Sequence, residues 1–245
     1  MQAPLSIPVI AVVGSRHSGK TATVETVVRG LTKKGYRVAT AKHIHDINFT
    51  IDTEGRDTWR HTKAGAHITL AVSASELATI NKLDTSQLTL SDITKHCEDK
   101  TEVIVLEGFR GLIDQDLTVP KIVTAKNKQE IEEATQVFKP ILAFTTMSPK
   151  AEFKELKTPP VDIKKETEKL IQIIDQRINP IITKRRETTV STSIDINGKP
   201  LPLNPYVQKI TRNVLLAILS TLKGTQPTGN ENIQIKITTP NKPTS

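Results

Sequence analysis

The segment from Gly14 to Thr21 could bind the phosphates of a nucleotide. It reads Gly-Ser-Arg-His-Ser-Gly-Lys-Thr and matches the pattern G-x-x-x-x-G-K-[ST] at every fixed position. The glycines allow a tight turn, so that successive N–H groups of the loop and of the next helix face one anion. In this motif the lysine reaches the β- and γ-phosphates and the last hydroxyl holds Mg²⁺. The predicted phosphate-binding residues are Gly14, Ser15, Arg16, His17, Ser18, Gly19, Lys20 and Thr21.

A second candidate group follows the apolar run of residues 103–106, which ends in the acid Glu107. A carboxylate at the carboxyl edge of a parallel sheet would lie beside the phosphate loop. There it could hold Mg²⁺ through water or orient an attacking water. We therefore expect Thr21 and Glu107 to hold the metal, and Lys20 and Glu107 to take part in catalysis.

The third candidate segment is Lys42-His43-Ile44-His45-Asp46, which follows a second expected strand. We expect Lys42 and His43 to contact the nucleotide, and Asp57 to add a catalytic carboxylate. An alternative is a metal site built from His43, His45 and a nearby carboxylate. A further alternative is a polar loop that contacts nucleotide, substrate or merely solvent, because His-x-His without a third ligand specifies a metal weakly.

Alternating strands and helices must position these residues. Strands are expected at residues 7–13, 37–42, 67–73, 103–106, 121–124 and 141–144. Helices are expected after the phosphate loop, with Gly35 at the end of that helix, and at 91–98, 129–136 and 163–178. This alternation predicts an α/β fold of the P-loop NTPase type: a mostly parallel sheet with helices on both faces.

The pattern changes after Pro180, which we expect to end the last helix of a nucleotide-binding domain at residues 1–180. Residues 181–187, which include Lys184-Arg185-Arg186, are expected to form a basic linker. Residues 188–239 predict a small α+β unit in the order β-β-α-β, with its last strand at residues 233–237. Its signals are the hairpin pair Asn197-Gly198 and the helix start Asn204-Pro205. Residues 240–245 are expected to be a tail.

Composition narrows the class of protein. The chain has 245 residues, a net charge of +8 and a pI near 9.5. It contains no apolar run of about 20 residues that could span a bilayer. The N-terminus lacks the features of a signal peptide, and the single cysteine, Cys97, excludes an internal disulfide. We expect a cytoplasmic protein without a membrane association. The basic charge fits a solvated surface, or alternatively a surface that attracts polyanions such as nucleotides. Nucleic acid is not expected as a partner, because the C-terminal unit lacks aromatic residues for base stacking.

Five segments in order resemble the molybdopterin-guanine dinucleotide biosynthesis protein B family. They are the phosphate loop, Lys42-His43-Ile44-His45-Asp46, residues 52–60, Ala64-Gly65-Ala66 and Glu107-Gly108-Phe109-Arg110. The similarity covers residues 8–175, and the extension after Thr188 is similar to that of some archaeal members. Two positions depart mildly: Arg56 replaces the usual lysine and Thr58 the usual serine.

The resemblance implies a protein that binds GTP with Mg²⁺ and hydrolyses it weakly. It implies an accessory role beside the guanylyltransferase that attaches GMP to molybdopterin. The partners that it implies are this transferase, molybdopterin-containing intermediates and a second copy of the chain in a homodimer. Guanine selection rests on the resemblance, because Lys126-Asn127-Lys128-Gln129 lacks the acid of the usual GTPase motif. The residues also leave open a small-molecule kinase, a metallochaperone GTPase that uses His43 and His45, and a binding module formed by the C-terminal unit.

Overall fold

The protein is described by a computed structural model that covers residues 7–46, 48–97, 100–148, 153, 156, 159–189, 194–196 and 199–222. The chain forms two compact units, Met1–Thr183 and Lys184–Ser245. No helix in these described ranges is long and apolar enough to cross a membrane.

The first unit is built on a six-stranded sheet in the order β2-β5-β1-β6-β7-β8, in which every neighbouring pair is parallel. The central strands β1 and β5 are continuous runs of β-branched and aliphatic residues, as expected for strands covered on both faces. The six strands are β1 (Val9–Gly14), β2 (Val38–Lys42), β5 (Val103–Glu107), β6 (Lys121–Thr124), β7 (Ile141–Thr146) and β8 (Val161–Asp162).

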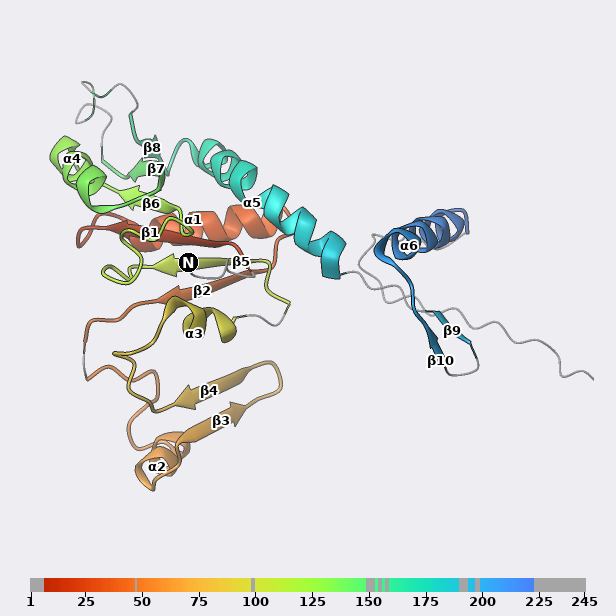
Figure 1. Ribbon diagram of the computed structural model, residues 1–245. Coiled ribbons are helices and arrows are strands. Elements are labelled where there is room, and N and C mark those ends of the chain that lie inside the picture. The colour runs from red at the N-terminus through yellow and green to blue at the C-terminus, as the bar shows by residue number, and fades with distance from the viewer. Residues whose placement is uncertain are drawn as a thin grey trace, which may run out of the picture. The chain divides into compact units, whose positions relative to one another are not determined.

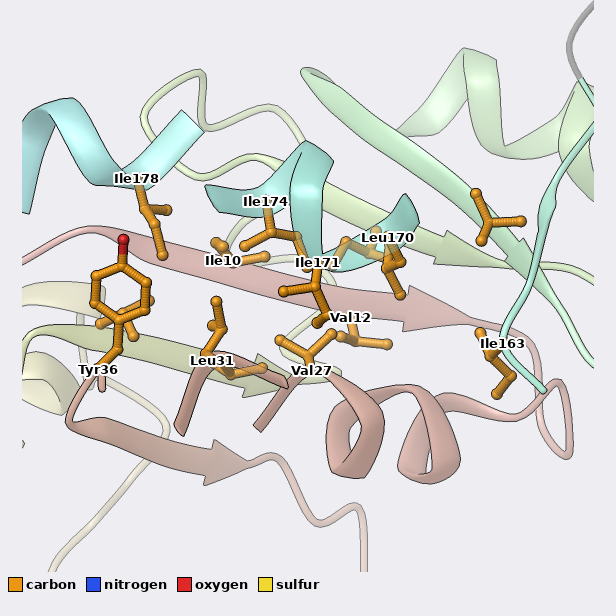
Figure 2. Close-up of a cluster of buried hydrophobic side chains, with 14 of the residues drawn as sticks. Ile10, Val12, Val27, Leu31, Tyr36, Ile163, Leu170, Ile171, Ile174 and Ile178 are labelled. Atoms are coloured by element: carbon orange, nitrogen blue, oxygen red, sulfur yellow. The ribbon is translucent and has the colours of Figure 1, made fainter. Parts of the chain in front are cut away.

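Helices cover both faces of this sheet (Figure 1). On one face, Ile10 and Val12 of β1 pack with Val27 and Leu31 of α1 and with the isoleucines of α5, as Figure 2 shows. On the other face, neighbouring side chains of β1 pack with α3 and α4. The α/β fold predicted from the sequence is confirmed. The helices are α1 (Lys20–Lys33), α3 (Leu90–Lys95), α4 (Lys128–Val137) and α5 (Thr167–Thr189).

The expected end of α5 at Pro180 is wrong, because the helix continues to Thr189 with the proline inside it. The residues expected to form a linker, 181–187, are therefore helical. Proline removes one backbone donor and crowds the preceding turn. Ile178 and Ile182 lie on either side of it, are 1% and 2% exposed, and belong to the same core cluster. The free energy gained by burying these two side chains offsets the free-energy cost of the proline inside the helix.

A separate antiparallel hairpin lies outside the main sheet. It consists of β3 (Ile68–Val72) and β4 (Leu77–Asn81), and it packs with α2 (Asp57–Lys63), where Thr62 and Thr69 share a hydrogen bond of 3.1 Å. The sequence predicted β3 as a strand but not its partner β4. The segment between β2 and β5 thus leaves the parallel sheet, forms α2 and the β3–β4 hairpin, and then returns to the sheet (Figure 1).

The second unit contains a hairpin of β9 (Ile194–Ile196) and β10 (Lys199–Leu201), followed by α6 (Pro205–Ser220). The helix begins as predicted: the Asn204 side chain accepts a hydrogen bond from the Val207 N–H at 3.0 Å, and Pro205 is the first helical residue. The hairpin turn at residues 197–198, the third strand expected near residues 233–237 and the tail at 240–245 lie outside the described residues.

Candidate phosphate-binding site

The phosphate loop connects β1 to α1 and depends on two glycines. Gly14 has φ of +152°, and a Cβ there would lie 2.2 Å from Thr124 Oγ1 and 2.4 Å from the Thr124 carbonyl oxygen. Gly19 precedes α1 with φ of +97°, where a Cβ would lie 2.7 Å from Met147 Sδ. Both positions combine a left-handed backbone with close neighbours, so only glycine fits without displacement.

Hydrogen bonds from hydroxyl groups hold the middle of the loop in place. Ser18 is 3% exposed, donates to the Ser15 carbonyl at 2.9 Å, and lies 2.5 Å from Thr124 Oγ1. Thr124 in turn donates to the Val13 carbonyl at 3.1 Å. Because Thr124 ends β6, the neighbouring strand braces the loop. Arg16 and His17 are exposed on the loop itself.

Lys20 lies across this loop. Its ammonium donates to the carbonyl of Gly14 at 3.2 Å and to that of Ser15 at 2.6 Å. Burial lowers the pKa of Lys20 below its ordinary value. Glu107 opposes that shift, and the cations Lys42 and Arg110 add to it. The cation of the motif is thus held against the carbonyl groups of the loop itself.

Thr21, Lys42 and Glu107 meet at the carboxyl edge of the sheet. Glu107 is 8% exposed, and its Oε1 accepts from Thr21 Oγ1 at 2.9 Å and lies 3.1 Å from Lys42 Nζ. The pairing of β2 with β5 places Lys42 opposite Glu107, and α1 brings in Thr21. Three segments far apart in the sequence therefore supply one hydroxyl, one carboxylate and one ammonium.

A residue that the sequence analysis missed lies on the other flank of the loop. Glu130, in the first turn of α4, accepts from Ser15 Oγ at 2.9 Å and from the Lys126 N–H at 2.8 Å. Lys126 Nζ lies 3.2 Å from the same carboxylate and donates to the Arg16 carbonyl at 3.4 Å. These contacts lower the pKa of Glu130 although partial burial acts to raise it. The only local signal was the helix start Asn127-x-x-Glu130, which marks a cap.

The two histidines after β2 lie beside the segment that follows β5. The ring centroids of His43 and His45 are 4.5 Å apart, and those of His43 and Phe109 are 5.5 Å apart. Across the residues that the structure describes, no group of three or more His, Cys, Asp or Glu side chains could hold a metal ion. Among these residues, a metal site at His43 and His45 would therefore lack a third protein ligand.

Asp57 is not brought to this site. It is the first residue of α2, its side chain is 90% exposed, and it lies 3.9 Å from Arg60 one turn later. The prediction that Asp57 would join the catalytic group expected the segment after Asp46 to stay near the sheet edge. That segment leads instead to the β3–β4 hairpin, so Glu107 is the carboxylate that faces Thr21 and Lys42.

The parallel sheet, the loop after its central strand and the carboxylate of the neighbouring strand define a P-loop protein of the α/β class. Residues 9–147 match the family model of molybdopterin guanine dinucleotide synthesis protein B, and the chain belongs to this family.

Two relatives illustrate the extent of the similarity. A Methanocaldococcus jannaschii protein, named as a candidate molybdopterin-guanine dinucleotide biosynthesis adapter, is 24% identical over 94% of this chain and 97% of its own length. The Haemophilus influenzae molybdopterin-guanine dinucleotide biosynthesis adapter protein is 27% identical over 58% of this chain and 76% of its own. The first similarity thus extends through the C-terminal unit as well.

Solved structures agree with the fold. A crystal structure of Bacillus subtilis MobB has a TM-score of 0.52 and 23% identity, and covers 68% of this chain and 98% of its own. Another crystal structure of a molybdopterin-guanine biosynthesis protein B has a TM-score of 0.51 at 21% identity, and covers 70% of this chain and 99% of its own. The α/β fold is therefore shared across nearly the whole of the two solved chains and across 68% and 70% of this one.

Proposed function

We propose that this protein binds GTP with Mg²⁺ and acts as an adapter in the attachment of GMP to molybdopterin. The observation that carries the proposal is the meeting of Thr21, Lys42 and Glu107 beside the phosphate loop. Family membership and the adapter names of the relatives supply the pathway. The partner we expect is a molybdopterin guanylyltransferase.

The oxygen atoms at this edge fit Mg²⁺. Thr21 Oγ1 and Glu107 Oε1 lie 2.9 Å apart, and both are hard oxygen donors of the type that Mg²⁺ prefers. Thr21 would bind the ion directly and Glu107 would bind it directly or through water. When bound, the ion neutralises charge on the terminal phosphates. Lys20 would then exchange its bonds to loop carbonyls for bonds to phosphate oxygens.

The same geometry supports slow hydrolysis. Rapid GTP hydrolysis needs a group that orients the attacking water and a cation that stabilises the transition state. Glu107 already accepts from Thr21 and pairs with Lys42, and Asp57 lies elsewhere. We therefore propose that bound GTP serves mainly to organise the adapter for its partner, with weak turnover.

A homodimer is the second part of the proposal. The hairpin β3–β4 exposes apolar side chains on one face, because Leu77 of β4 pairs with Val72 of β3: Leu70 is 60% exposed, Val72 77% and Leu77 66%. An isolated two-stranded sheet is marginally stable in water. A second copy of the chain would bury these residues. Sedimentation of the wild type and of a Leu70→Lys, Val72→Lys double variant tests this, and a monomeric wild type would refute it.

The nucleotide proposal is tested by measuring binding of GTP and ATP to the full chain with and without Mg²⁺. Replacing Lys20 by alanine removes charge-assisted hydrogen bonds to phosphate, so GTP affinity should fall about 10- to 100-fold. Lys33→Ala is the matched control, since Lys33 is an exposed lysine on the same helix. Equal binding of ATP, or a Lys20→Ala variant with normal affinity, contradicts the proposal. Co-purification with a molybdopterin guanylyltransferase tests the adapter role.

A further inference from the structure

Three rings from two loops gather beside the phosphate site. His43 and His45 follow β2, and Phe109 follows β5. His43 contacts both of the others, with ring centroids 4.5 Å from His45 and 5.5 Å from Phe109. The His43 N–H donates to the Glu107 carbonyl at 3.0 Å, which fixes the position of its backbone. We call His43, His45 and Phe109 the aromatic cluster.

Core packing does not account for this cluster. Both imidazoles are exposed, and only Phe109 is half-buried against the core. Phe109 also has φ of +58°, next to Gly108 with φ of +88°. A non-glycine residue in the left-handed region is strained, and such strain gathers at ligand sites where the surroundings hold it. The turn after β5 thus directs a ring towards the histidines at an energetic cost.

The position of the cluster relates it to one end of a bound nucleotide. Thr21 belongs to the end of the loop that holds Mg²⁺ at the terminal phosphates, and it donates to Glu107 at 2.9 Å. Glu107 in turn accepts from the backbone of His43. The cluster therefore lies on the side of the terminal phosphates, whereas the base of a nucleotide lies at the opposite end of the triphosphate chain.

The charges beside the cluster favour an anionic group on the ligand. Lys42 precedes His43, its side chain is 56% exposed, and its ammonium pairs with Glu107 at 3.1 Å. Arg110 follows Phe109, is exposed, and lies over the Phe138 ring with its guanidinium 5.3 Å from the ring centroid. Flat aromatic side chains stack on nitrogen heterocycles, and neighbouring cations pair with phosphate. Stacking also explains the cluster better than a metal does, because the described residues offer no third ligand.

We propose that His43, His45 and Phe109 form a stacking site for the planar nitrogen heteroaromatic ring of a second, phosphate-bearing ligand. The chemistry fits a pterin. The site deepens the proposed function and rests on it only for the assumption that a nucleotide occupies the adjacent loop. It gives the adapter a place to hold the pterin ring beside the phosphate loop. The transfer of GMP, which breaks the bond between the α- and β-phosphates and releases pyrophosphate, is left to the partner transferase.

The test uses free pterin and guanosine as separate probes on the full chain. Pterin binding is followed by quenching of its fluorescence, and guanosine binding by calorimetry. Removing one stacked side chain should weaken pterin binding about 5- to 100-fold in both His43→Ala and Phe109→Leu. His43→Phe keeps a ring and should restore binding. His61→Ala, which removes an exposed histidine of α2, should bind as the wild type does.

Each outcome decides the assignment. Absence of pterin binding, or equal binding by His43→Ala and the wild type, overturns it. Displacement of pterin by GTP, or cluster-dependent binding of guanosine in preference to pterin, assigns the rings to the base of the nucleotide and overturns the second-ligand proposal. Persistence of His43-dependent pterin binding at saturating GTP supports it. If GTP fails to bind while His43-dependent pterin binding remains, the proposed function fails and the stacking site stands.

Discussion

Lys121 is a lysine buried at the start of β6, and its replacement by methionine should alter how stability depends on pH. The side chain is 0% exposed, and its ammonium donates to the carbonyls of Asp116 and Lys139, both at 2.6 Å. Burial lowers the pKa of Lys121 from 10.5 to about 8, and the neighbouring Asp116 and Asp114 only partly oppose this. The folded protein therefore releases this proton at lower pH than the unfolded chain does.

The sign and size of the effect follow from proton linkage. Between pH 8 and 10.5 the unfolded chain binds more protons at this lysine, so the free energy of unfolding rises with pH. The stabilisation that Lys121 contributes is complete above the pKa that this lysine has in the unfolded chain. It is lost as pH falls through the pKa that the lysine has in the folded protein. A shift from 10.5 to about 8 corresponds to roughly 3 kcal/mol.

Urea unfolding of the wild type and of Lys121→Met between pH 7.5 and 10.5 measures this contribution. The methionine leaves two carbonyls without their donor at every pH, which adds an offset but no slope. The stability difference between wild type and variant should therefore grow in favour of the wild type by roughly 3 kcal/mol over this range. Lys164→Met, at an exposed lysine, is the control and should follow the wild type. A difference that stays flat with pH refutes the reasoning.

Three further predictions concern the phosphate site. Glu130→Ala removes the hydrogen bonds to Ser15 and Lys126, so GTP affinity should fall about 5- to 10-fold with the melting temperature little changed. The control Glu132→Ala, on the same helix, should have no effect, and equal losses of affinity in the two variants would contradict a positioning role for Glu130. Glu107→Gln keeps an acceptor for Thr21 but loses the charge, so the gain in GTP affinity on adding Mg²⁺ should shrink about tenfold; an unchanged Mg²⁺ dependence would place the ion elsewhere. Gly14→Ala should destabilise the fold by about 2–4 kcal/mol in urea unfolding, because its Cβ meets Thr124. Gly35→Ala, with φ of +85° and no atom within 4 Å, should cost only about 1–2 kcal/mol, and similar losses at both glycines would refute the overlap.

Several elements could be predicted because their signals are local. The strand Val9–Gly14, the loop after it and the start of α1 follow from apolar runs and glycine spacing within one segment. Gly35, expected to end α1, has φ of +85°, and Asn204 caps α6 as its sequence context indicates. In each case the physical cause is local: it is a backbone conformation or a hydrogen bond between residues at most three positions apart in the chain.

Other features depend on partners distant in sequence. The sequence predicted Lys121 only as part of a strand. Its side chain can be buried because the carbonyl groups of Asp116 and Lys139, which are distant in sequence from each other, accept hydrogen bonds from its ammonium. Helix α5 continues past Pro180 because Ile182, in the next turn, packs in the hydrophobic core. In the hairpin partner β4, Leu77 is exposed and Ala78 and Ile80 are only half-buried, so the run of apolar residues that marks a core strand was weak there.

The sequence by itself determined the phosphate loop, the parallel sheet around it and the acid at the end of β5. Only the tertiary structure decided which side chains face that loop. It selected Glu107 and Lys42, added Glu130 from α4 and left Asp57 on the distant helix α2. The reason is that parallel strands meet at one sheet edge whatever their separation in the chain. The connections between them, which sequence patterns specify poorly, determine which of the remaining polar residues lie there.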